Sequence, residues 1–163
     1  MITVAIITVS DRSSQGKRED LSGPVIQSWA ESKGYIVKSV KIVPDEIESI
    51  KKALTDYSDE GIDLIITTGG TGFATRDVTP EATCAVIEKF APGFAEVMRM
   101  KSFQITPHAM LSRAVSGIRK KSLIINMPGS PKAVRENLGF IEEGIPHAIE
   151  LLQSKVTDCG SPV

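Results

Sequence analysis

The stretch IDLIITTGGTG, residues 62 to 72, places a short apolar run directly before a cluster of glycines. Ile62–Thr67 is rich in β-branched residues, which predicts a strand buried on both faces. Thr68–Gly72 follows at once and predicts a tight glycine-rich turn at the end of that strand. A strand of this kind is typical of a parallel sheet, because parallel sheets are covered by helices on both faces.

Strand-like and helix-like segments alternate along the rest of the chain. Ile2–Val9 and Tyr35–Val43 are predicted strands, while Ala114–Arg119 and Ser122–Met127 are predicted to pair as a hairpin across Lys120-Lys121. Predicted helices begin near Ser22 or Pro24, Asp45, Thr79, Pro92, Lys132 and Pro146. This alternation predicts an α/β fold, a three-layer sandwich with a mostly parallel central sheet.

Length and composition are those of a globular protein. The chain has 163 residues, of which 41% are hydrophobic and 24% charged. We expect a single domain over residues 1–154 and a flexible tail over residues 155–163. Cys84 and Cys159 are far apart, and the N-terminus lacks a basic start and a cleavage signal, which favours the cytoplasm. No apolar run reaches the ~20 residues that cross a bilayer, so no membrane contact is expected.

Charge is unevenly divided along the chain. The net charge is −1, yet the segment from Arg99 to Arg135 holds eight Lys and Arg residues and no Asp or Glu, which leaves −9 for the remainder. This basic segment either forms a solvated face or lines a site for a polyanionic ligand. Binding of nucleic acid is not favoured, because Phe103 is the segment's only aromatic residue for base stacking.

Four polar segments are expected at one edge of the sheet. Parallel strands end on the same side, and Ser10-Asp11, Asp45, the glycine-rich loop with Asp77, and Asn126–Lys132 each follow a predicted strand. Ligands of open α/β sheets bind at that edge. The polar residues that continue the first segment, up to Ser22, are predicted as an exposed loop.

Two of these segments have the features of anion-binding loops. The amides of Thr68–Gly72 can surround a phosphate, although a tight turn without a ligand has the same composition. Pro128-Gly129-Ser130 leads into a predicted helix, whose free amides favour an anion. A plain turn with Ser130 as the helix cap is the alternative. Two such loops on one edge favour a ligand with more than one phosphate.

Two carboxylates, Asp45 and Asp77, are expected beside these loops. Mg²⁺ is usually bound through one or two carboxylates together with substrate phosphates, which this combination fits. Asp45 is also placed to cap the following helix, with Glu48 completing a capping box, and Asp77 can be a turn residue. The chain has two histidines and no nucleophile motif, which argues against covalent catalysis. Phosphoryl or nucleotidyl transfer requires no protein nucleophile.

Several longer motifs resemble the molybdopterin adenylyltransferase family. They are SDRSS (10–14), EDLSGP (19–24), IVPDEIE (42–48), TTGGTGFATRDVTPEAT (67–83) and MLSRAVSGIRKKSLIINMPGSPK (110–132). The resemblance extends from Ile2 to about Leu152. It implies the molybdopterin-binding (MogA-like) fold, a homotrimer, and adenylylation of molybdopterin by MgATP with release of pyrophosphate, a step of molybdenum cofactor biosynthesis. A separate molybdate-insertion protein is implied as a partner.

The resemblance also implies roles for individual residues. Asp45 and Asp77 match the family's two catalytic aspartates and are expected to hold Mg²⁺. The positions that match the family's substrate-binding residues are Ser10, Asp11, Thr68, Gly69, Gly70, Thr71, Gly72, Ser112, Asn126, Pro128, Gly129 and Ser130. Both aspartate motifs are intact, which favours an active enzyme. A non-catalytic molybdopterin carrier or scaffold of the MoaB type is the alternative.

Overall fold

Four parallel strands form the larger part of a six-stranded sheet. The computed structural model describes residues 1–154, and its strands lie in the order β2-β1-β3-β6-β5-β4. The strands are β1 (Thr3–Val9), β2 (Ile36–Val43), β3 (Leu64–Thr68), β4 (Lys89–Phe90), β5 (Ser116–Arg119) and β6 (Ser122–Met127). β2, β1, β3 and β6 run parallel, whereas β5 pairs antiparallel with both of its neighbours, β6 and β4. The predicted mostly parallel sheet and the predicted hairpin are both confirmed.

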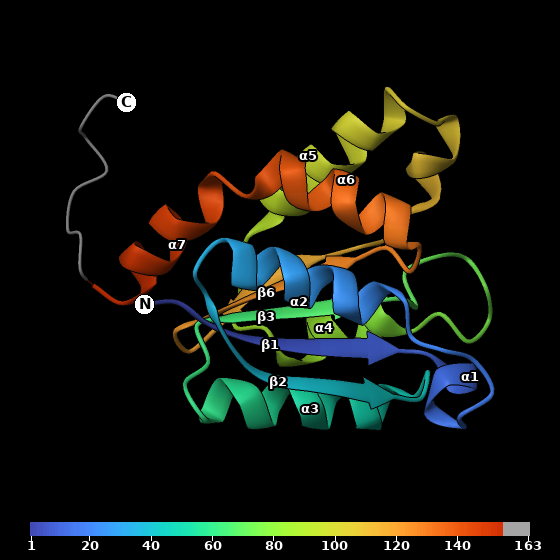
Figure 1. Ribbon diagram of the computed structural model, residues 1–163, viewed down its shortest axis with the longest axis horizontal. Coiled ribbons are helices and arrows are strands. Elements are labelled where there is room, and N and C mark those ends of the chain that lie inside the picture. The colour runs from blue at the N-terminus through green and yellow to red at the C-terminus, as the bar shows by residue number, and fades with distance from the viewer. Residues whose placement is uncertain (155–163) are drawn as a thin grey trace.

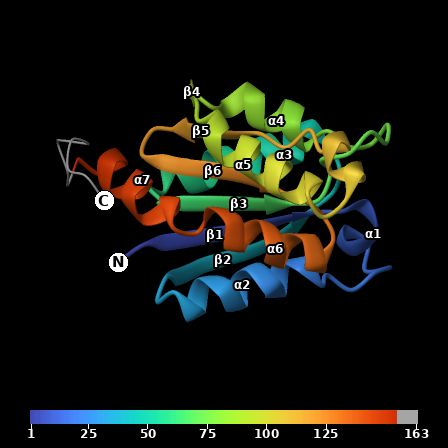
Figure 2. The ribbon, with the colours of Figure 1, turned by 90° about the horizontal axis from the view of Figure 1, so that it is seen from above.

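Helices cover both faces of the sheet and complete three layers (Figure 1). α2, α5, α6 and α7 lie on one face, and α3 and α4 lie on the other (Figures 1 and 2). The helices are α1 (Asp11–Ser14), α2 (Ser22–Ser32), α3 (Ile47–Asp59), α4 (Thr79–Val86), α5 (Pro92–Phe103), the 3-10 helix η1 (Pro107–Leu111), α6 (Pro131–Ile141) and α7 (Gly144–Leu152). None of these helices of residues 1–154 is long and apolar enough to cross a membrane.

β3 is the strand on which both cores depend. Every residue of β3 is buried, with Leu64 and Ile66 in the core under α2 and α6, and Ile65 in the core under α3. The run of apolar residues is continuous because β3 lies between β1 and β6 and is covered from both sides. This position carries the glycine-rich turn to the centre of the sheet edge.

The structure contains two short elements that the sequence did not predict. The segment Ser10–Ser22, predicted as a loop, contains the one-turn helix α1, in which the Ser13 amide donates to the Ser10 hydroxyl at 3.1 Å. The two-residue edge strand β4 has no sequence signal, because it is too short for an alternating pattern. The tail predicted over residues 155–163 lies outside the described residues.

Asn126 is a buried brace within the sheet. Its amide nitrogen donates to the hydroxyls of Thr67 on β3 and Thr83 on α4, both at 2.9 Å. Its amide oxygen accepts from the backbone nitrogen of Val115 at 3.1 Å. The side chain is fully buried and its hydrogen bonds cross between elements. The sequence predicts Asn126 as a substrate-binding residue, but the hydrogen bonds of its side-chain amide join the sheet to α4.

We predict that Asn126→Ala lowers the free energy of unfolding by about 1–3 kcal/mol, since it leaves buried partners without hydrogen bonds. Urea denaturation followed by circular dichroism measures the change. Gln27→Ala is the control, because Gln27 bonds only the exposed Glu31 carboxylate, and surface changes usually stay within about 0.5 kcal/mol. Unchanged stability in Asn126→Ala with weakened ligand binding would contradict the structural role.

Candidate functional site

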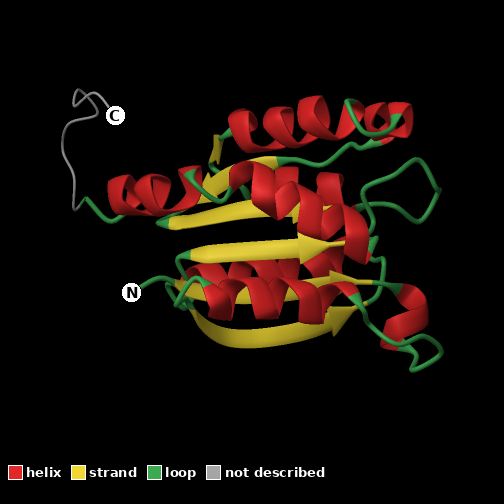
Figure 3. Cartoon of the chain, turned by 45° about the horizontal axis from the view of Figure 1, so that its top comes forward, coloured by secondary structure: helices red, strands yellow, loops and turns green. Residues whose placement is uncertain are grey.

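The parallel strands end at a common edge, and a cavity opens there. The arrowheads of the parallel strands point toward the same side of the molecule (Figure 3). The cavity has a volume of about 340 Å³ and is bordered by the ends of β1 and β3 and by the start of α6. Its lining consists of Thr8, Val9, Ser10, Ser13, Arg18, Glu19, Asp20, Leu21, Ser22, Asp45, Thr68, Gly69, Gly70, Asp77, Gly129, Ser130 and Pro131. Residues far apart in sequence therefore meet where ligands of such sheets bind.

Two glycines of the turn after β3 are required by close packing. Gly69 has a φ of +95°, and a Cβ there would lie 2.4 Å from the carbonyl oxygen of Val9. Gly70 has a φ of +66°, and its Cβ would lie 2.4 Å from the Thr79 hydroxyl and 3.1 Å from Asp45 Oδ1. Only glycine adopts this backbone without strain. The cavity floor is consequently bare backbone, which a ligand can approach closely.

The second predicted anion loop lies against the first. Ser130 caps α6, its hydroxyl accepting from the Ala133 amide at 3.2 Å. A Cβ on Gly129 would lie 3.4 Å from the Gly69 Cα, so the two turns are in contact. The Thr68 hydroxyl donates to the Pro128 carbonyl at 2.7 Å and ties them together. The free amides and the positive dipole end of α6 therefore face the same cavity as the glycine-rich turn.

Asp45 faces the cavity and does not cap α3. The predicted capping box is wrong: Glu46 occupies the cap position without a side-chain hydrogen bond, because the Asp45 carboxylate accepts from the Asp11 amide at 2.7 Å. Partial burial raises the pKa of Asp45, and the nearby charges of Asp11 and Asp77 raise it further. The carboxylate is thus held in a place that disfavours its ionised form in the ligand-free protein.

Asp77 reaches the cavity from the loop that follows the glycine-rich turn. Its Oδ2 accepts from the Ala74 amide at 3.0 Å, and a Cβ on Gly72 would lie 2.9 Å from that oxygen. Asp45 and Asp77, which come from the loops after β2 and β3, therefore share one cavity with both glycine turns.

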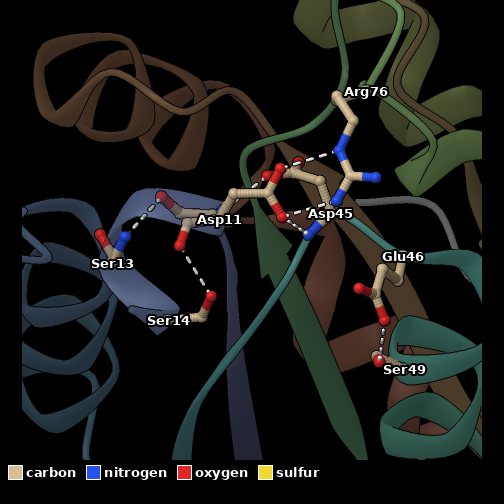
Figure 4. Close-up of polar contacts among 8 residues, drawn as sticks. Asp11, Ser13, Ser14, Asp45, Glu46, Ser49 and Arg76 are labelled. Carbon is tan, nitrogen blue, oxygen red and sulfur yellow. Dashed lines mark hydrogen bonds and ion pairs between the residues drawn. The ribbon is translucent and has the colours of Figure 1, made fainter. Parts of the chain in front are cut away.

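Asp11 is bound to neighbours on two loops. Its carboxylate accepts from Arg76 Nε at 2.9 Å and Nη2 at 2.8 Å, and from the Asp45 amide at 3.0 Å (Figure 4). The Arg76 guanidinium lowers the pKa of Asp11. Asp11 does not appear in the cavity lining, whereas its neighbour Ser10 does.

A comparison with protein families identifies the family of the chain. Residues 5–147 match the family model described as a probable molybdopterin binding domain. The chain belongs to this family. The family resemblance carried by the sequence motifs is thereby confirmed.

Relatives and solved structures match most of the chain. The molybdopterin adenylyltransferase of Helicobacter pylori (strain J99 / ATCC 700824) is 47% identical over 156 residues, which are 93% of this chain and 88% of the relative. Gephyrin of Dictyostelium discoideum is 49% identical over 93% of this chain, but the chain spans only 23% of gephyrin. The crystal structure of the molybdopterin biosynthesis enzyme MoaB from Thermus thermophilus is 44% identical with a TM-score of 0.90, covering 94% of this chain and 98% of that one.

The remaining predicted residues of the family site fall in three places. Ser112 and Pro128 line a second, more apolar cavity of about 230 Å³ between α5, η1 and α6. Thr71 is buried in the turn, where its carbonyl accepts from the Arg113 amide at 2.9 Å. Gly72 lies beside Asp77 rather than in the cavity lining. Because Pro128 and Gly129 are consecutive, the two cavities are neighbours.

The basic segment Arg99–Arg135 does not line the first cavity. None of its eight Lys and Arg residues, all within the described part of the chain, is in that lining. Arg113 instead donates to the carbonyls of Gly72 and Asp77, both at 2.8 Å, and pairs with Glu81. Lys120, another residue of the basic segment, pairs with Asp59, which lies outside the segment. The basic segment therefore does not line this cavity, although its residue Arg99 lines the second one.

Sequence reasoning missed several residues of the cavity wall. Asp20 accepts from the Thr8 hydroxyl at 2.8 Å and from the Gly23 amide at 3.0 Å, which holds the loop before α2 over the end of β1. Arg18 supplies the positive charge of this wall. The EDLSGP motif was the available signal, since Asp20 lies within it.

The two aspartates offer the oxygen ligands that a magnesium ion takes. Within residues 1–154 no group of three or more His, Cys, Asp and Glu side chains is arranged to hold a metal alone. Oδ1 of Asp45 and Oδ1 of Asp77 accept no hydrogen bond from the described residues, so each has a ligand oxygen to offer. Mg²⁺ commonly completes its shell with water and substrate phosphates, which the adjacent amide-lined turns can hold.

We predict that Asp45→Asn raises the melting temperature of the ligand-free protein at pH 7. The pKa of Asp45 is raised on folding, so the ionised side chain costs stability above that pKa, and the cost disappears as pH falls below the unfolded value of about 3.9. Asparagine removes the charge and keeps an acceptor for the Asp11 amide.

Thermal unfolding at several pH values measures this effect, and the gain should shrink toward low pH. Asp56→Asn is the control, because the Asp56 side chain is partly exposed and pairs with Lys52 on the surface of α3. A lower melting temperature for Asp45→Asn at pH 7 would show that the charged form is favoured.

Proposed function

We propose that this chain is a molybdopterin adenylyltransferase, which transfers AMP from MgATP to the terminal phosphate of molybdopterin and releases pyrophosphate. The observation that carries the proposal is the joining of two amide-rich turns and two carboxylates in one cavity. The relative in Helicobacter pylori has this name and is similar over 88% of its length. The proposed role is a step in molybdenum cofactor biosynthesis.

The chemistry requires positioning more than covalent catalysis. An oxygen of the molybdopterin phosphate forms a bond to the α-phosphorus of ATP, and the bond from that phosphorus to the β-phosphate oxygen breaks. The substrate itself is the nucleophile, so the chain needs no activated side chain. The bare backbone at Gly69 and Gly70 and the amides at the start of α6 are suited to hold phosphate oxygens.

Charge stabilisation is the second requirement of the reaction. Asp45 and Asp77 are proposed to hold Mg²⁺, which when bound neutralises phosphate charge. Arg18 lies in the same wall and adds a positive side chain near the phosphates. The raised pKa of Asp45 is consistent with a carboxylate placed for a cation.

The second cavity is proposed to take the pterin part of molybdopterin. Its lining is mainly apolar and includes Met98, Ser112 and Pro128, which suits a flat heterocycle with a few polar edges. Because Pro128 precedes Gly129, a ligand in this cavity can extend its phosphate toward the glycine-rich turn. The predicted roles of Ser112 and Pro128 in substrate binding remain part of this proposal.

We propose that the chain forms a homotrimer and that a separate molybdate-insertion protein is its partner. An apolar hollow on the outside of α5 and α6, lined in part by Phe94, Val97 and Phe140, supports contact between copies. The separate insertion protein is proposed because adenylylated molybdopterin must pass to a protein that binds molybdate. The site described within residues 1–154 is assigned to the adenylylation step and not to molybdate.

We predict that Asp45→Ala and Asp77→Ala each lower the turnover number at least about 100-fold, since each removes a proposed Mg²⁺ ligand. Incubation with molybdopterin and MgATP, followed by mass detection of adenylylated molybdopterin and measurement of pyrophosphate, gives the rates. Asp56→Ala, on the far surface of α3, is the control and should turn over as the unchanged protein does. Circular dichroism verifies that each variant is folded.

The outcomes separate the two functions that the family motifs allow. Pyrophosphate release that depends on both molybdopterin and Mg²⁺ supports the adenylyltransferase. Tight molybdopterin binding without pyrophosphate release supports the carrier or scaffold instead. Turnover by Asp45→Ala or Asp77→Ala at the rate of the unchanged protein would contradict the proposed metal ligands.

A further inference from the structure

Three loops of the site meet at one carboxylate, that of Asp11. Oδ2 accepts from Arg76 Nε at 2.9 Å, and Oδ1 accepts from Arg76 Nη2 at 2.8 Å and from the Asp45 amide at 3.0 Å (Figure 4). In the opposite direction, the Asp11 amide donates to Asp45 Oδ2 at 2.7 Å. The loops after β1 and β2 are thus joined by a reciprocal pair of hydrogen bonds.

Arg76 connects the third loop to this pair. It directly precedes Asp77 in the sequence, and it lies 65 residues from Asp11. The outer part of its loop, Phe73–Arg76, is exposed to solvent. On the other side of the loop, Arg113 binds the carbonyls of Gly72 and Asp77. The hydrogen bonds from Arg76 to Asp11 join the exposed part of this loop to the loop of Asp45.

We propose that the ion pair of Asp11 and Arg76 positions the carboxylates of Asp45 and Asp77 relative to each other. Asp11 is on this view a positioning residue and not a ligand of the substrate, because both oxygens of its carboxylate are occupied by neighbours. Arg76 is the second positioning residue. The inference rests on the proposed function, because that function gives Asp45 and Asp77 their role as Mg²⁺ ligands. The contact between the loops does not depend on that role.

The ion pair is suited to fixing geometry and contributes little to global stability. The Arg76 side chain is 59% exposed and that of Asp11 30% exposed, and exposed pairs typically contribute only about 0.2–1 kcal/mol. Its two parallel N–H···O bonds nevertheless set both distance and orientation. A displacement of ~1 Å in a catalytic group can lower a rate by about 100-fold. Loss of the pair should therefore affect turnover far more than unfolding.

The test compares Arg76→Gln, Asp11→Asn and the double variant in the full chain. Turnover is measured with molybdopterin and MgATP, and melting temperature by circular dichroism. Hydrogen exchange of the amides of residues 70–78, without ligand, measures the loop directly and does not depend on activity. Lys52→Gln is the matched control, since it removes the exposed ion pair of Lys52 and Asp56 at 2.7 Å, away from the site.

We expect each single variant to lower the turnover number about 10- to 100-fold while leaving the melting temperature and the KM for ATP close to those of the unchanged protein. The double variant should be no slower than the slower single variant, because both changes break the same pair. Exchange at residues 70–78 should be faster in all three variants. Arg76→Lys, which keeps the positive charge but not the two separate nitrogen donors, should recover part of the rate. Lys52→Gln should match the unchanged protein in every measurement.

Two results would overturn the inference. Unchanged exchange at residues 70–78 in Arg76→Gln would show that the pair does not hold the loop. Additive losses, with Asp11→Asn raising the KM, would show that Asp11 contacts the substrate. If the unchanged protein makes no adenylylated molybdopterin, the proposed function fails, while the exchange measurement still decides whether the pair fixes the loop.

Discussion

The close approach of Gly69 to Val9 is the contact on which the site depends. A Cβ at position 69 would lie 2.4 Å from the Val9 carbonyl oxygen, so the turn after β3 can rest on the end of β1 only without a side chain. Gly129 lies against Gly69 in turn. The ends of β1, β3 and β6 are thereby brought to one cavity, and the other groups of the site take their positions around this bare backbone.

Asp45 illustrates how such a site departs from what stability alone favours. A carboxylate that capped α3 would stabilise the helix, yet Asp45 turns toward the cavity and leaves α3 without a side-chain cap. Its pKa is raised by burial and by the neighbouring carboxylates Asp11 and Asp77. Unfavourable placement of this kind is common at functional sites, where a ligand supplies the missing partner.

The distribution of charge is informative only after the chain is folded. The segment Arg99–Arg135 is strongly basic in sequence, but Arg113 binds loop carbonyls and Glu81, and Lys120 pairs with Asp59. The basic side chain of the first cavity, Arg18, comes from a different part of the chain. Linear charge density does not locate an anion site, because acidic residues distant in sequence can cover the basic ones.

The fold class and the identity of the segments that meet at the sheet edge follow from local sequence patterns. The β-branched run before Thr68–Gly72, the glycines and the helix-opening prolines are local signals, and parallel strands place their ends together by geometry. The contacts of each polar side chain at this edge follow only from the folded arrangement. Asn126 braces the sheet, Asp45 faces the cavity, and Asp11 binds Arg76 from 65 residues away. These roles depend on distances between residues remote in sequence, which no local pattern encodes.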